Sequence, residues 1–147
     1  MPFIKKITCS LCLIAAIAGQ AQAAEQGSPE QLMSALQAQL PNQEFNFMYV
    51  PSADSYFSNK MMVGMLKSGT VTSAAQEIIA LLSSGVKQLA VGSKNEQVAA
   101  ATLERALIQL KGKQLDAKVA YIGGEEYRHA LLQAAAAAGV TLEFATP

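Results

Sequence analysis

Short apolar runs alternate with longer amphipathic segments along the second half of the chain. The apolar runs are Val86–Val91, Ala117–Ile122 and Val140–Phe144, and each has the length of a strand. Between them, Ser93–Lys111 and Glu125–Ala138 repeat apolar residues at the spacing of a helix. Strands separated by helices of this length pair in parallel through helical crossovers. The pattern therefore predicts an open α/β sheet.

The first half of the chain adds one strand, Glu44–Val50, and the helices around it. Both faces of this strand are largely apolar, which is typical of a strand covered on two sides. One helix precedes it and ends at Pro41, and two follow, Asn59–Lys67 and a second that begins at Ser73. Thr70–Thr72 could instead form a stub of extra strand. The expected N-caps of the first four helices are Ser28, Ser58, Ser73 and Ser93.

These elements predict a three-layer α/β fold with about four mainly parallel strands and helices on both faces. The third strand, Ala117–Ile122, is apolar on both faces and is expected at the centre. Val140–Phe144 alternates apolar and polar residues and is expected at an edge. Right-handed crossovers leave 2-1-3-4 as the economical strand order. This is a flavodoxin-like or Rossmann-like architecture.

The N-terminus has the features of a secretory signal peptide. Lys5 and Lys6 precede the apolar run Ile7–Ala18, and Ala21-Gln22-Ala23 is a small-x-small cleavage pattern. Cleavage there gives a signal peptide over 1–23, a single α/β domain over 24–147 and a periplasmic location. The alternative is an N-terminal anchor that is never cut. Both cysteines, Cys9 and Cys12, lie in this segment, so the mature chain has no thiol.

The charge balance excludes two classes of partner. Removing Lys5 and Lys6 leaves nine basic side chains against eleven acidic ones, and no block of like charge occurs. A nucleic-acid partner requires a basic stripe, and a membrane-surface helix requires a cationic face. We therefore expect neither nucleic acid nor, after cleavage, membrane as a partner.

The predicted strand order places a ligand crevice between the first and third strands, where the order reverses at the carboxyl rim. Its walls are the loop after the first strand and the double-glycine turn after the third, with the start of the helix at Ser93 to one side. The candidate ligand-binding residues are Ser52, Asp54, Ser55, Tyr56, Ser93, Lys94, Gly123, Gly124 and Glu125.

These residues favour a small polar or zwitterionic ligand. Lys94 at a helix N-terminus suits a phosphate or carboxylate, although it could equally be solvated. Glu125 and Glu126 oppose an anion and suit an amine, or simply complement the helix dipole. Lys94 and Glu125 could straddle a zwitterion or pair with each other. Asp54 alone makes a poor metal site, because calcium needs six or more oxygens.

The sequence indicates no catalytic group, metal site or cofactor. His129 is the only histidine and is expected on the surface. The P-loop, the dinucleotide-binding fingerprint and the nucleophile-elbow pattern are all absent from the sequence. Met61, Met62 and Met65 are expected to pack in the core rather than to form an adaptable binding face.

We therefore expect a non-enzymatic binding or accessory module for a small polar ligand. The alternative is a protein–protein interaction subunit of an envelope assembly, docking through an edge strand or the methionine-rich helix. An enzyme is the least supported class, and Asp54, Glu125 and His129 are the residues that it would use.

Overall fold

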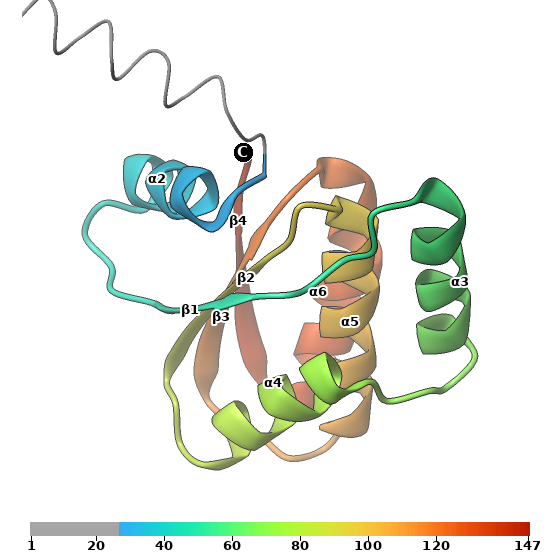
Figure 1. The fold of residues 1–147 in the computed structure, drawn as a ribbon. Helices are drawn as coiled ribbons and strands as arrows, with labels where there is room; N and C mark the ends of the chain where they lie inside the picture. Colours follow the sequence, from blue (N-terminus) through green and yellow to red (C-terminus); the bar gives the residue numbers. More distant parts are fainter. Residues whose placement is uncertain (1–26) are drawn as a thin grey trace, which may run out of the picture.

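The computed structural model describes residues 27–147, so the predicted signal peptide over 1–23 lies outside the described residues. The described chain alternates helices and strands (Figure 1). In chain order these are α2 (Pro29–Gln39), β1 (Asn46–Tyr49), α3 (Tyr56–Lys67), α4 (Ser73–Ser83), β2 (Gln88–Gly92), α5 (Glu96–Gln109), β3 (Ala117–Ile122), the 3-10 turn η1 (Glu125–Tyr127), α6 (Arg128–Ala138) and β4 (Val140–Ala145). No described helix has both the length and the apolar character needed to cross a membrane.

The four strands form one parallel sheet, which confirms the α/β class. β3 lies between β2 and β4, and β4 lies at an edge, as predicted. The predicted strand order 2-1-3-4 is wrong, because the order is β1-β2-β3-β4. Each crossover advances the chain by one strand in the same direction, so the order never reverses as it does in a flavodoxin-like sheet.

This strand order decides which helices cover which face. Three right-handed crossovers that advance in one direction place all their helices on one face of the sheet. Accordingly, α3 and α4 both pack on α5, and α5 packs on α6. In the order 2-1-3-4, α3 and α4 would lie on the opposite face from α5. Only α2, which precedes the first strand, covers the other face (Figure 1).

The two faces of the sheet bury side chains of different size. Towards α3–α6, Leu89, Val119 and Tyr121 are fully buried against the inner faces of the helices. Beneath α2, Leu32 and Leu36 pack on a smaller set: Ala90, Ala120, Ile122 and Ala145. The central helix α5 is enclosed by the sheet and its neighbours, and every residue from Val98 to Leu103 is buried.

The helix starts correct several expected boundaries. Ser28 caps α2 as predicted, but α3 is capped by Ser55, three residues before the expected Ser58. Thr72 caps α4 instead of Ser73, and Asn95 caps α5 instead of Ser93. In each case a nearby hydroxyl or amide competes for the same free N–H groups, which sequence spacing cannot resolve. Thr70–Thr72 contributes no strand to the described sheet.

Gly139 ends α6 with the left-handed conformation expected of a C-terminal glycine, with φ of 74°. A Cβ atom there would lie 2.7 Å from Cα of Gln114, in the loop before β3. Gly112 has a similar φ of 82°, but a Cβ there would have no neighbour within 4 Å. Substituting the two glycines therefore separates the energetic cost of the left-handed backbone conformation from the cost of a steric clash with Gln114.

We expect Gly139→Ala to lower the free energy of unfolding by about 2–4 kcal/mol, from a left-handed penalty plus a steric clash. Gly112→Ala is the matched control and should cost only about 1 kcal/mol, from conformation alone. Urea unfolding of both variants measures the difference. Equal losses would show that the contact with Gln114 does not constrain this turn.

Candidate functional site

The carboxyl ends of all four parallel strands lie at one rim of the sheet, so the three predicted loops share that rim. However, β2 lies between β1 and β3, and the predicted crevice between the first and third strands is therefore not formed. That part of the site prediction is wrong, because a reversal of strand order is what opens such a crevice.

The double-glycine turn accommodates a buried tyrosine. Tyr121 Oη donates a hydrogen bond to the carbonyl of Glu96 at 3.0 Å, which ties the end of β3 to the start of α5. A Cβ on Gly123 would collide with the Tyr121 ring, and one on Gly124 would lie 3.0 Å from Glu96 Oε2. The Gly124 N–H donates to that carboxylate oxygen at 3.1 Å. Gly123 and Gly124 thus serve packing inside the protein.

The start of α5 is also occupied by the protein's own groups. Ser93 is buried, and its Oγ accepts a hydrogen bond from the Asn95 N–H at 3.2 Å. Asn95 Oδ1 accepts from the Val98 N–H at 3.0 Å. Lys94 is exposed, and Gly27 packs against its backbone. Because the Glu96 carboxylate lies in the first turn, a bound anion would meet a negative charge here.

The loop after β1 is held by local hydrogen bonds. Asn59 accepts from the Ala53 N–H at 2.8 Å and donates to the Ala53 carbonyl at 3.1 Å. Ser55 Oγ accepts from the Ser58 N–H at 3.1 Å as the cap of α3. Ser52 is half-buried and Asp54 is exposed. Sequence analysis missed Asn59, whose Asx-like bonding to a preceding loop is visible only once α3 begins at Tyr56.

Glu125 lies on the surface, where Arg128 Nη2 approaches its Oε1 at 3.5 Å. The guanidinium of Arg128 also lies 4.3 Å from the centre of the Phe144 ring. Of the predicted site residues, the structure brings the double-glycine turn to the N-terminus of α5. The loop after β1 begins beside Gly92, next to Ser93, but β2 separates it from the double-glycine turn.

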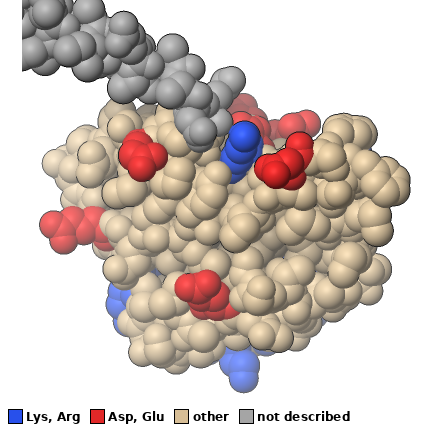
Figure 2. Space-filling model, viewed as in Figure 1, with Lys and Arg blue, Asp and Glu red and all other residues tan. Residues whose placement is uncertain are grey.

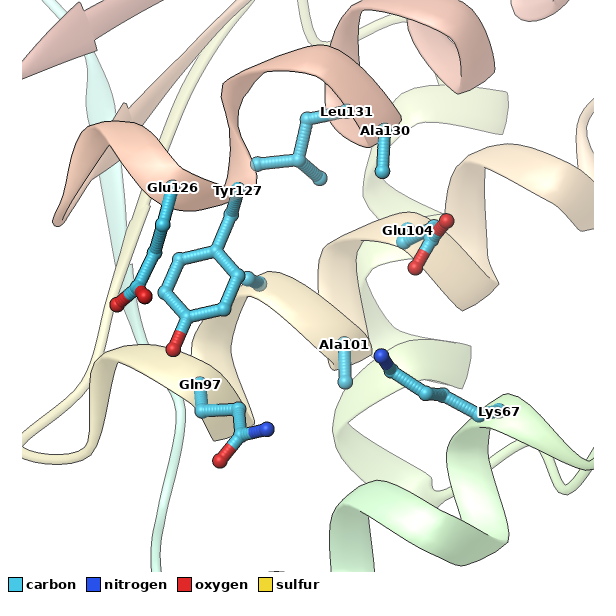
Figure 3. Close-up of a pocket in the computed structure, with 9 residues that line it drawn as sticks. Lys67, Gln97, Ala101, Glu104, Glu126, Tyr127, Ala130 and Leu131 are labelled. Atoms are coloured by element: carbon cyan, nitrogen blue, oxygen red, sulfur yellow. The ribbon is translucent and has the colours of Figure 1, made fainter.

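A groove on the helical layer was not predicted (Figure 3). It lies over α5, between the end of α3 and the start of α6, and has a volume of about 240 Å³. Alanines of α5 and α6 form its floor, and its polar walls carry Lys67, Gln97, Glu104, Glu126 and Tyr127. Of these, only Glu126 was considered from the sequence. Lys67, Gln97 and Glu104 occupy outward helix positions, where a polar side chain usually only contacts water.

The groove combines both signs of charge. Glu104 and Glu126 supply two carboxylates, and Lys67 supplies an ammonium group (Figure 3). Burial, followed by a hydrogen bond to Glu126, raises the pKa of Tyr127 to about 12, so its hydroxyl remains protonated. The groove can therefore offer a cation, carboxylates and a phenol to a small polar molecule.

The outer face of α3 exposes a row of large apolar side chains. Phe57 is 71% exposed, Met61 54% and Met65 47%, and their four-residue spacing aligns them along one helix face. Tyr56 is 78% exposed and carries Lys60 Nζ 5.5 Å above its ring. We call Tyr56, Phe57, Met61 and Met65 the α3 face. The expected core packing of the methionines is wrong for Met61 and Met65.

Within residues 27–147, no group of three or more histidine, cysteine, aspartate or glutamate side chains could hold a metal ion. His129 is exposed on α6, as predicted. Comparison of the chain with family models, curated proteins and solved structures gives no match.

Tyr121 makes the alkaline stability of the protein testable. Burial, and then the Glu96 carboxylate, raises the pKa of Tyr121 above its ordinary value of 10.0. The folded protein therefore holds this proton longer than the unfolded chain does. The stabilisation is complete below about pH 10 and is lost as the pH rises towards the folded-state pKa.

We expect Tyr121→Phe to lower the free energy of unfolding by about 1 kcal/mol at neutral pH, because the hydrogen bond to Glu96 is lost. Above about pH 10 the free energy of unfolding should fall less steeply with pH in this variant than in the wild type. The decline removed is at most about 1.4 kcal/mol per pH unit. Urea unfolding across the alkaline range measures it, and Tyr56→Phe on the surface is the control. A Tyr121→Phe curve parallel to that of the wild type would contradict the assignment.

Proposed function

We propose that this protein is an exported, non-enzymatic interaction module that binds a protein partner of the cell envelope through the α3 face. The observation that carries the proposal is the exposure of Phe57, Met61 and Met65 along one helix. Contiguous exposed apolar side chains on a soluble domain mark interaction sites, whereas scattered ones need no explanation. Export rests on the signal-peptide pattern of residues 1–23.

The charges of α3 indicate the chemistry of the partner. Lys60 and Lys67 lie on this helix, which has no acidic residue. A complementary surface is therefore apolar at its centre and acidic at its rim. Methionine side chains adapt their shape to a partner, and aromatic ones bury large areas at low entropic cost. Both properties suit a surface that binds another protein.

The carboxyl rim supports this choice over a rim-bound ligand. Tyr121, Glu96 and Gly124 satisfy one another there, and Asn95 and Ser93 cap their own turn. Hydrogen-bond donors used inside the protein are not free to bind a ligand. The remaining large exposed apolar groups, Met33, Ile108 and Leu132, lie on other helices and serve as internal comparisons.

We expect Phe57→Ser and Met61→Gln each to weaken partner binding by roughly 30-fold, about 2 kcal/mol, as central contacts do. The mature protein, as its host exports it, is cross-linked in an envelope extract to identify the partner. The affinity of the purified pair is then measured by isothermal titration calorimetry. Ile108→Gln and Leu132→Gln, at 40% and 43% exposure, are matched controls.

Binding should also weaken with salt if Lys60 and Lys67 face an acidic rim. A partner whose affinity is unchanged by both α3 substitutions would exclude the α3 face as the docking surface.

A second candidate function is the binding of a small polar or zwitterionic ligand in the groove over α5. Its supporting observation is that Lys67 lines the same groove as Glu104 and Glu126, with Glu126 on the opposite side from Lys67 (Figure 3). A ligand carboxylate would meet the ammonium group, and a ligand amine would meet the carboxylates. This keeps the predicted ligand chemistry but moves it from the rim of the sheet to the helical layer.

We expect free amino acids to raise the melting temperature, while neutral sugars and nucleotides do not. At a concentration about 100 times Kd, binding adds about 3 kcal/mol, which is a rise on the order of 10 °C. Lys67→Met and Glu126→Gln should abolish the rise, and Glu30→Gln on α2 should retain it. The absence of a shift with every amino acid would rule this candidate out.

A further inference from the structure

The β1 edge of the sheet has unpaired backbone groups. Among the described strands, β1 pairs only with β2. The Val50 N–H donates to the Gly92 carbonyl at 2.8 Å, so Val50 faces β2. Because successive residues of a strand alternate in direction, Met48 also faces β2, whereas Phe47 and Tyr49 direct their N–H and C=O groups outward. Such a row is a template for another strand.

β1 is short, with four residues, but it lacks the charged side chains that usually oppose edge pairing. The strand Asn46–Tyr49 contains no charge and no proline, and Asp54 is the only charged residue between Phe45 and Asn59. In Figure 1 β1 is the strand nearest the viewer, and Figure 2 shows that the surface over it carries few charged side chains.

The opposite edge strand, β4, is protected by charge. Glu143 of β4 forms an ion pair with Lys118 of β3 at 3.2 Å. Arg128 covers the ring of Phe144, also on β4. Inward-pointing charges on an edge strand are a common device against further pairing. The two edges therefore differ, and only β1 is open to addition.

A hollow with apolar and polar walls lies between α2 and β1, with Gln37, Gln43 and Glu44 on its polar side. α2 has most of its sheet contacts with β3 and β4 and covers this corner only in part, so Phe45, Phe47 and Tyr49 are half-buried against its leucines. The hollow has a volume of about 320 Å³ and is lined by Met33, Leu36, Phe45 and Phe47, among others. The rings of Phe47 and Tyr49 lie beside each other there, with centroids 6.5 Å apart.

We propose that β1 pairs with β1 of a second copy of this chain, antiparallel and about a two-fold axis normal to the sheet. The two sheets then join into one of eight strands. The outward groups of Phe47 and Tyr49 in one copy meet those of the other, and their side chains gather on the same face. This inference concerns a different surface from the α3 face and does not rest on the proposed function.

Electrostatics favours a second copy as the occupant. In a two-fold interface a surface meets itself, so a charged strand would repel its own copy. β1 has no charge, and an antiparallel alignment sets Glu44 against the Val50–Pro51 end of the other strand, away from the other Glu44. Because the protected β4 edge cannot continue the sheet, pairing closes at two copies.

Sedimentation equilibrium of the chain as its host processes it tests the proposal. We expect a dimer whose dissociation constant rises at least tenfold in Asn46→Lys, because a lysine on an edge strand opposes pairing and each copy adds one charge to the joined edge, and rises less in high salt. Thr141→Lys puts the same charge on an exposed position of β4 and should leave the dimer intact. A wild type that stays monomeric, a dimer insensitive to Asn46→Lys, equal effects of both variants, or assemblies larger than two would each overturn it.

Hydrogen exchange of the wild-type protein gives a second measurement that needs no variant. The amides of Phe47 and Tyr49 should exchange more slowly as protein concentration rises, because they become bonded only in the dimer. The amide of Met48, which faces β2, should be protected at every concentration. Exchange at Phe47 and Tyr49 that does not depend on concentration would overturn the proposal.

Discussion

The handedness of parallel connections determines most of this structure. A strand, its crossover and the next parallel strand form a right-handed unit, and the three such units here all advance in the same direction. Their helices must then share one face of the sheet. The other face has only α2, and one helix cannot cover four strands. The hollow between α2 and β1 and the enclosed position of α5 both follow from this constraint.

The side chains of the sheet match this unequal covering. Ala90, Ala120 and Ala145 beneath α2 are small and allow a single helix to lie close to the strands. Leu89 and Tyr121 fill the deeper layer under the crossover helices. Most of the large apolar groups that remain exposed lie on the outside of α3, whereas Phe47 and Tyr49 of β1 are half-buried. The two interaction surfaces that we propose are the outer face of α3 and the free edge of β1. Both lie at the periphery of the fold, where no other described element covers them.

The carboxyl rim shows how a packing requirement can resemble a binding motif. A double glycine at the end of a parallel strand is typical of a loop that approaches a phosphate. Here Gly123 is required because the ring of Tyr121 lies where its Cβ would be. Gly124 donates its N–H to Glu96, a residue of the neighbouring helix. The glycines permit a close approach, but the approaching group belongs to the protein itself.

The α/β class, the central position of Ala117–Ile122 and the edge position of the last strand were predictable, because periodicity and strand length depend on neighbours in the sequence. The exposed position of His129 followed in the same way. Strand order was not predictable, since β1 and β2 have apolar residues on both faces and would suit 1-2-3-4 and 2-1-3-4 equally.

Only the tertiary structure decided that order. With it came the loss of the predicted crevice, the exposure of Met61 and Met65 and the placing of Lys67 and Glu126 on the walls of one groove. The physical reason is that a sequence specifies which residues avoid water, whereas the direction of each crossover specifies which other residues they meet.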